Sequence, residues 1–191
     1  MTYMNKLKVL AVVALAAASA LSCSSELTNN AAPVELVVTN TQNLSHIDLD
    51  PNNNDPECNQ ELGTITMQIF PKNSSASGDF VQVRVTRYRV TYRRTDGGTQ
   101  VPASFTRAID TLIGVGQTAG SDFRIFEADA FNLAPFAALL PQNGGVDPDT
   151  HRPIIQMEVT VEVFGETLAG DKVSDSTSFP IEFCYTCNGC D

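Results

Sequence analysis

From residue 34 onward, apolar side chains alternate with polar ones along most of the chain. Between 154 and 164, the odd-numbered positions are all apolar and the even-numbered positions enclosed by them are polar. A period of two is typical of β-strands that bury one face. The pattern predicts strands at 34–39, 62–70, 80–94, 103–112, 122–126, 154–164 and 173–183. Because turn-forming residues separate these strands, we expect an all-β, antiparallel β-sandwich of about seven strands.

Two of these strands carry irregularities. In 80–94, the apolar positions are odd-numbered from Val81 to Val85 and even-numbered from Tyr88. One extra residue at 86–87 would reconcile the two halves, so we expect a β-bulge there. The last strand contains Pro180, which has no backbone N–H to donate, and this predicts an edge strand.

One segment has helical spacing. Leu133, Phe136 and Leu140 lie three and four residues apart, Asn132 is a favourable N-cap, and Pro135 is tolerated in a first turn. We therefore expect one short helix, which closes an open end of the sandwich.

The strands carry a family resemblance. Residues 88–92 precede the turn sequence Thr95-Asp96-Gly97-Gly98, and a late hairpin is expected across 158–182. This stretch resembles the strands of immunoglobulin-like or fibronectin type III-like domains in bacterial surface lipoproteins, over residues 33–183. The resemblance implies an immunoglobulin-like sandwich but no particular function, because such sandwiches have many unrelated roles.

The N-terminal segment is typical of a signal peptide at 1–22. Lys6 and Lys8 precede an apolar run at 9–18, which is shorter than the roughly 20 residues that a membrane-spanning helix needs. The run ends in small residues, as expected before a cleavage site.

The segment Ala20-Leu21-Ser22-Cys23 resembles a lipobox, although the commonest pattern has leucine where this chain has Ala20. The resemblance implies that Cys23 receives acyl chains, palmitate among them, and becomes the new N-terminus. Residues 23–33 then form a lipidated, polar tether of up to about 35 Å, and 34–191 form the domain. Ser24 after the cysteine resembles the outer-membrane sorting pattern of enteric bacteria, which implies the outer membrane. The sequence leaves open which side of that membrane the domain faces. The alternative is an ordinary signal peptide with an incidental cysteine.

The net charge of the chain limits the classes of partner that it can bind. Without the leader, which holds Lys6 and Lys8 and no acid, 22 acidic residues face 10 basic ones, a net charge of −12. An acidic surface repels phosphate backbones and anionic headgroups, so we expect no nucleic acid partner. We expect the protein to bind the membrane through its lipid anchor alone.

Four further cysteines follow Cys23: Cys58, Cys184, Cys187 and Cys190. In an oxidising compartment an even number of thiols favours disulfides, and three pairings are possible. We expect Cys58 to pair with Cys184, and Cys187 with Cys190. The alternative is a four-thiolate zinc site, since the last three cysteines have ligand-like spacing.

A polar loop at 48–57 collects oxygen ligands of the kind that calcium takes, at Asp48, Asp50, Asp55 and Glu57. The loop does not follow the EF-hand pattern, because Asn53 stands where glycine is required. We expect a polar loop and no cofactor, with calcium as the alternative.

One strand holds half of the mature chain's basic residues: Arg84, Arg87, Arg89, Arg93 and Arg94. They could form a docking face for an acidic protein partner. The strand carrying Glu158 and Glu162 is the expected neighbour, and we favour cross-strand charge pairs as the explanation.

No catalytic motif is recognisable. His46 and His151 fall in expected loops, and the proximity of Ser45, His46 and Asp48 in sequence does not establish a triad. We expect a lipid-anchored, non-catalytic protein of the cell envelope that serves as a binding or structural module with a protein partner. The alternatives are a metal- or ligand-binding lipoprotein, and an accessory subunit of an envelope or surface assembly.

Overall fold

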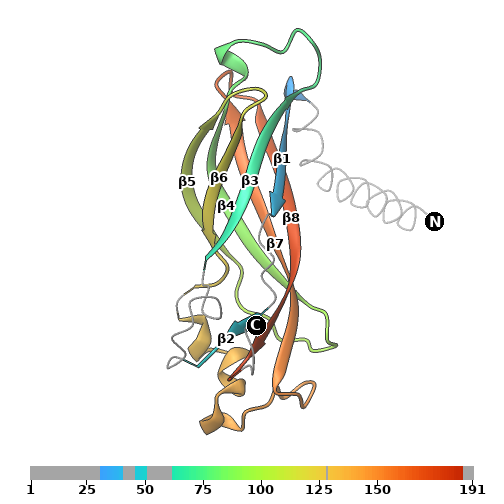
Figure 1. The fold of residues 1–191 in the computed structure, drawn as a ribbon, viewed down its shortest axis with the longest axis vertical. Helices are drawn as coiled ribbons and strands as arrows, with labels where there is room; N and C mark the ends of the chain where they lie inside the picture. The colour runs from blue at the N-terminus through green and yellow to red at the C-terminus, as the bar shows by residue number, and fades with distance from the viewer. Residues whose placement is uncertain (1–30, 41–45, 51–61, 128, 187–191) are drawn as a thin grey trace, which may run out of the picture.

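A computed structural model of the chain describes residues 31–40, 46–50, 62–127 and 129–186 (Figure 1). Eight strands account for most of this part of the chain: β1 Val34–Asn40, β2 His46–Asp48, β3 Leu62–Pro71, β4 Val83–Arg94, β5 Phe105–Ile113, β6 Thr118–Arg124, β7 Ile154–Thr167 and β8 Lys172–Cys184. Four short 3₁₀ turns complete it: η1 Asp79–Val81, η2 Ala130–Asn132, η3 Phe136–Leu139 and η4 Pro141–Asn143.

The strands form two sheets, in the orders β1-β3-β6 and β2-β8-β7-β4-β5. Every pair is antiparallel except β2 with β8, which is parallel. The all-β prediction is confirmed, and the seven predicted strands match β1 and β3 to β8 with shifted ends. β2 was not predicted, because its three residues are too few to show a period.

One core lies between the sheets, built from the alternating apolar positions of both. Tyr88 of β4 packs edge-on against Phe105 and Phe123. Its hydroxyl accepts the Arg124 N–H at 3.1 Å, and the Tyr92 hydroxyl donates to the Ile125 carbonyl at 2.6 Å. Burial of its ring raises the pKa of Tyr92, since the charged form would lie in an apolar environment. These bonds connect β4 to the β6 segment across the core.

The predicted bulge is confirmed, because the register of β4 against both β5 and β7 shifts between Val85 and Arg87. Among the described strands, the edge-strand prediction for β8 holds along the segment that contains Pro180 but not at the C-terminal end of the strand. β2 lies outside β8 and pairs with Glu182–Cys184, so β8 is the second strand of its sheet. Pro180 is accommodated because this pairing begins two residues after it.

The predicted helix is instead the run of 3₁₀ turns η2 to η4. Side chains three residues apart align in a 3₁₀ turn, so Phe136 and Leu139 share the buried side. Leu133, which helical spacing had placed in the core, is 57% exposed. Phe136 packs against Phe183 and Phe126 with ring centroids 4.5 and 6.4 Å apart, and so closes one end of the core as expected.

The domain has two distinct ends (Figure 1). At the entry end, β1 begins beside the 72–82 connection, and the Lys72 N–H donates to the Pro33 carbonyl at 3.0 Å. The turns β5–β6 and β7–β8 lie at this same end, and Gly170 takes the positive φ of 97° expected of its turn. At the loop end lie β2, η2 to η4 and the connection from β4 to β5.

The end of the predicted tether, at residues 31–33, belongs to the part of the chain that the structure describes, whereas 23–30 lie outside it. Ala32 is only 2% exposed and belongs to the core, so the packed domain begins before residue 34. Across the described ranges, none of the helices has the length and apolar character needed to span a membrane.

Candidate functional site

The loop end is organised by Arg94, the last residue of β4. After the bulge, even-numbered side chains of β4 point inward, so Arg94 is 2% exposed while its neighbour Arg93 is 71% exposed. Two connections surround Arg94, at 95–104 and 144–153, and we call them together the loop platform. A buried guanidinium therefore takes the place that an apolar side chain would otherwise fill.

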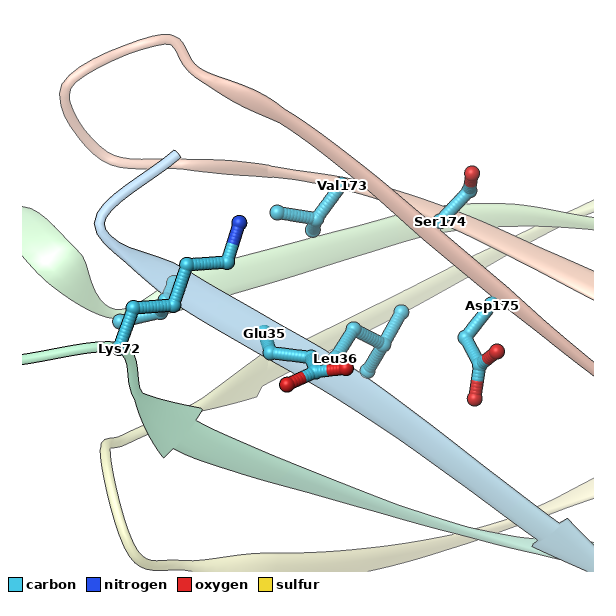
Figure 2. A pocket seen from close by; sticks show the side chains of 7 residues that line it. Glu35, Leu36, Lys72, Val173, Ser174 and Asp175 are labelled. Atoms are coloured by element: carbon cyan, nitrogen blue, oxygen red, sulfur yellow. The ribbon is translucent and has the colours of Figure 1, made fainter. Parts of the chain in front are cut away.

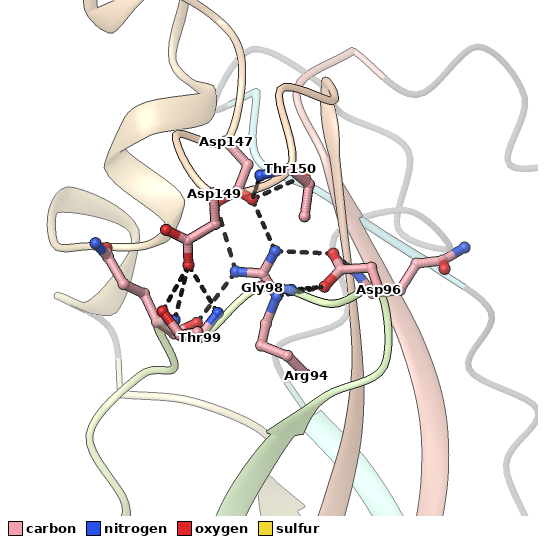
Figure 3. A network of polar contacts seen from close by, with 9 residues as sticks. Arg94, Asp96, Gly98, Thr99, Asp147, Asp149 and Thr150 are labelled. Atoms are coloured by element: carbon pink, nitrogen blue, oxygen red, sulfur yellow. Dashed lines mark hydrogen bonds and ion pairs between the residues drawn. The ribbon is translucent and has the colours of Figure 1, made fainter.

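All five N–H donors of Arg94 are used (Figure 3). Nε and Nη2 bind the two carboxylate oxygens of Asp96, both at 2.8 Å. Nη2 also donates to Asp147 Oδ2 at 2.8 Å, and Nη1 donates to Asp147 Oδ1 at 3.4 Å and to the Gln100 carbonyl at 3.1 Å. Bidentate geometry of this kind suits a guanidinium and cannot be reproduced by lysine.

The two carboxylates receive further hydrogen bonds from the backbone. Asp96 accepts from the N–H groups of Gly98 at 3.1 Å and Gln156 at 3.0 Å. Asp147 accepts from the N–H and hydroxyl of Thr150 at 3.0 and 2.8 Å. Desolvation opposes charge on Asp96, but the bonds from Arg94, Gln156 and Gly98 prevail and lower its pKa to about 2.

Asp149 fixes the outer part of the loop platform. Its Oδ2 accepts from the N–H and hydroxyl of Thr99 at 2.7 and 2.9 Å and from the Gln100 N–H at 3.2 Å. Gly98 lies so close to Arg94 that a Cβ there would come within 2.3 Å of the guanidinium carbon. The two connections are thus held to each other and to β4 by directional bonds.

These bonds make the loop platform sensitive to acid. The pKa of Asp96 falls from an ordinary 3.8 to about 2 in the fold, so its contribution to stability is present above pH 4 and is lost as the pH falls toward 2. We expect the urea midpoint to decrease over that interval, and to decrease less in Asp96→Asn. Asp110→Asn is the control, because Asp110 is exposed and pairs only with Arg84 among the bonds shown. Equal acid slopes for the wild type and Asp96→Asn would contradict this assignment.

Sequence reasoning did not find this network. The parity change at the bulge already placed Arg94 on the inward face, and the stretch Asp147-Pro148-Asp149-Thr150 is rich in residues that bond to nearby backbone. Neither signal says that the two segments meet, because 53 residues separate Arg94 from Asp147.

The arginines of β4 were the candidate partner face, and cross-strand pairing explains most of them. Arg89 pairs with Glu162, and Arg93 pairs with Glu158 at 2.6 Å on β7, as we favoured. On the other side, Arg84 pairs with Asp110 of β5 at 2.7 Å. The guanidinium of Arg87 lies over the Phe164 ring at 4.7 Å. Arg94 is buried and does not belong to any exposed face.

Several predicted site residues lie outside the described residues: Cys23, Asp55, Cys58, Glu57, Cys187 and Cys190. Cys184 is buried at the end of β8 and is not a free thiol. The cysteine pairing and the zinc alternative therefore remain predictions.

Of the oxygen ligands predicted for calcium, Asp55 and Glu57 lie outside the described residues, and Asp48 has other partners. Asp48 is buried at the end of β2, and its Oδ1 accepts the N–H groups of Asp50 at 2.8 Å and Thr186 at 2.9 Å. His46 lies beside Glu182 on the neighbouring strand, not in a loop. Within the part of the chain that the structure describes, no group of three or more histidine, cysteine or acidic residues could hold a metal ion.

A groove of about 380 Å³ opens between β1 and β8, where the two sheets approach each other at the entry end (Figure 2). Asp175 accepts the Val38 N–H through Oδ2 at 2.7 Å, so its carboxylate ties the sheets together. The groove is lined by Val34, Glu35, Leu36, Lys72, Val173, Ser174 and Asp175. The polar groups of the groove belong to the contact between β1 and β8, and we assign no ligand to the groove.

Comparison of the sequence with protein-family models and with curated proteins gives no match to either.

Proposed function

We propose that the chain is an exported lipoprotein of the cell envelope, anchored through acyl chains on Cys23, and that its β domain is a non-catalytic binding or structural module. The observation that carries this proposal is the opposite placement of the chain's entry and the loop platform. β1 begins at one end of the domain, eleven residues after Cys23, and the hydrogen-bonded loops lie at the other.

The loop platform supports binding rather than catalysis. Its buried charged groups are committed to one another, so Arg94 keeps no donor for a substrate. Its outer surface carries Val101 and Val146, which are exposed apolar side chains on anchored loops. Preformed loops with apolar side chains bind a protein partner at a low cost in conformational entropy.

We also propose an immunoglobulin-like arrangement of the two sheets. In such sandwiches, strands A and B neighbour each other in one sheet, with E on the far side of B, and strands G, F and C lie side by side in the other. The order β1-β3-β6 and the order β8-β7-β4 within the larger sheet β2-β8-β7-β4-β5 support this arrangement. Disulfides and outer-membrane localisation complete the proposal.

The anchor is tested by expressing the full chain in a Gram-negative bacterium with a clickable palmitate analogue. We expect the wild type to carry the label and to sediment with membranes, because two or three acyl chains give stable anchoring. Cys23→Ser should lose both properties, whereas the matched control Ser25→Ala should keep them. Labelling of Cys23→Ser, or cleavage of the wild type without labelling, would refute the lipoprotein assignment.

The same cells test the binding role. A photoreactive residue in place of Val101 should crosslink a distinct protein in the wild type, and one in place of Thr39, on the exposed face of β1, should not. An equal set of adducts from both positions would argue against the loop platform as the binding surface.

A further inference from the structure

We infer that the entry end of the domain rests on the lipid bilayer and inserts two apolar side chains, Phe80 and Leu168, among the headgroups. The inference rests on the proposed lipid anchor and deepens it. The anchor then determines which end of the domain meets the membrane, and these two side chains make the contact.

Phe80 and Leu168 come from different turns that are bonded to each other. The Ala169 N–H donates to the Phe80 carbonyl at 3.1 Å, and the Leu168 N–H donates to the Gln82 carbonyl at 2.9 Å. Phe80 is 75% exposed and Leu168 is 50% exposed. The 72–82 connection and the β7–β8 turn lie together at the entry end (Figure 1), and each carries one of these two large, exposed apolar side chains.

The length of chain between Cys23 and the domain determines which end of the domain can meet the bilayer. The eight residue steps from Cys23 to Ala31 span at most about 30 Å, at 3.3 to 3.6 Å per residue. β7 runs from one end of the domain to the other with 14 residues, and a strand of that length covers about 45 Å at 3.3 Å per residue. A tether of that reach cannot pass along the whole domain, so the loop end cannot be the end held against the bilayer.

The charges at the entry end argue for an apolar contact rather than an electrostatic one. Arg84 is paired with Asp110, and Lys172 with Glu166. The 72–82 connection adds Lys72 and Asp79, and the β7–β8 turn adds Asp171. Acidic groups therefore outnumber basic ones in these turns, anionic headgroups gain little here, and a bilayer of zwitterionic lipid is the partner that fits two exposed apolar side chains.

The absence of tryptophan from the sequence provides a direct test. Phe80→Trp places the only tryptophan of the chain at the tip, and an indole ring suits the bilayer interface. The lipidated full chain is reconstituted in phosphatidylcholine vesicles, with and without acyl-chain bromination. We expect the Phe80→Trp emission to shift to shorter wavelength on reconstitution and to be quenched by the brominated lipid.

Leu133→Trp is the matched control, because Leu133 is a similarly exposed apolar residue at the loop end. The emission of Leu133→Trp should be unchanged by vesicles. If Phe80→Trp fails to fold, Leu168→Trp replaces it, and the same shift and quenching are expected of that variant. Equal quenching at Leu133, or no quenching at either tip position in vesicle-bound protein, would overturn the inference and leave the anchor intact. A shift that appears without vesicles and grows with protein concentration would also overturn it, in favour of a second copy of the chain. If the protein carries no acyl chains, that result refutes the proposed lipid anchor rather than the contact made by the two side chains.

Discussion

Arg94→Ala is expected to destabilise the domain by about 3–5 kcal/mol, the usual result of removing one partner from a buried ion pair. The substitution leaves Asp96 and Asp147 buried among groups that cannot neutralise two negative charges. It also removes the bond to the Gln100 carbonyl, so the connection at 95–104 loses its attachment to β4. Urea unfolding at neutral pH measures the change.

Arg93→Ala is the matched control, since Arg93 is the adjacent residue and pairs with Glu158 at the surface. An exposed pair contributes at most about 1 kcal/mol, because solvent screens it and both side chains lose rotamer entropy in forming it. Equal losses in the two variants would contradict the assignment of Arg94 as the organising residue. Arg94→Lys should fall near Arg94→Ala, because one ammonium cannot replace five N–H donors.

Replacing the whole network by apolar side chains should not restore stability. In some proteins a buried ion pair can be exchanged for hydrophobic residues without loss. Here the carboxylates also accept N–H groups of Gly98, Gln156 and Thr150. Apolar replacements would leave those partly buried backbone donors unbonded, at a cost of up to about 1–3 kcal/mol for each group. The network is therefore part of how the loops fold, and it positions the proposed binding surface.

Much of the fold follows from the sequence because alternation reports directly on burial. The seven long strands, and the bulge between Val85 and Arg87, depend on a local period that a single chain displays. The cross-strand pairs Arg89–Glu162 and Arg93–Glu158 were predictable for the same reason, since adjacent strands in one sheet fix which side chains face each other.

The remaining features depend on contacts that no local pattern records. β2 pairs with β8 across more than 130 residues of chain, and its three residues carry no period. Asp147 meets Arg94 only because both connections reach the same end of the domain. The position at which the chain enters the domain is likewise visible only in three dimensions, and the proposed membrane-facing end depends on it.

The 3₁₀ turns at the loop end give the second large prediction. Phe136→Ala should cost about 3–5 kcal/mol, the usual range for removing a buried phenylalanine ring. Phe136 is fully buried and contacts the rings of Phe183 and Phe126, so its loss opens a cavity where β8 meets the loop end. Urea unfolding measures the loss of stability, with near-ultraviolet circular dichroism as a probe of the aromatic cluster.

Leu133→Ala is the control that distinguishes an α-helix from a 3₁₀ turn in this segment. An α-helix with the spacing of 133, 136 and 140 would bury Leu133 and Phe136 together, so both substitutions would be costly. The 3₁₀ turn buries Phe136 with Leu139 and leaves Leu133 in solvent, so Leu133→Ala should change stability by less than about 0.5 kcal/mol. Comparable losses at 133 and 136 would support the helix. A loss confined to Phe136 would support the turn, with Leu133 exposed to solvent.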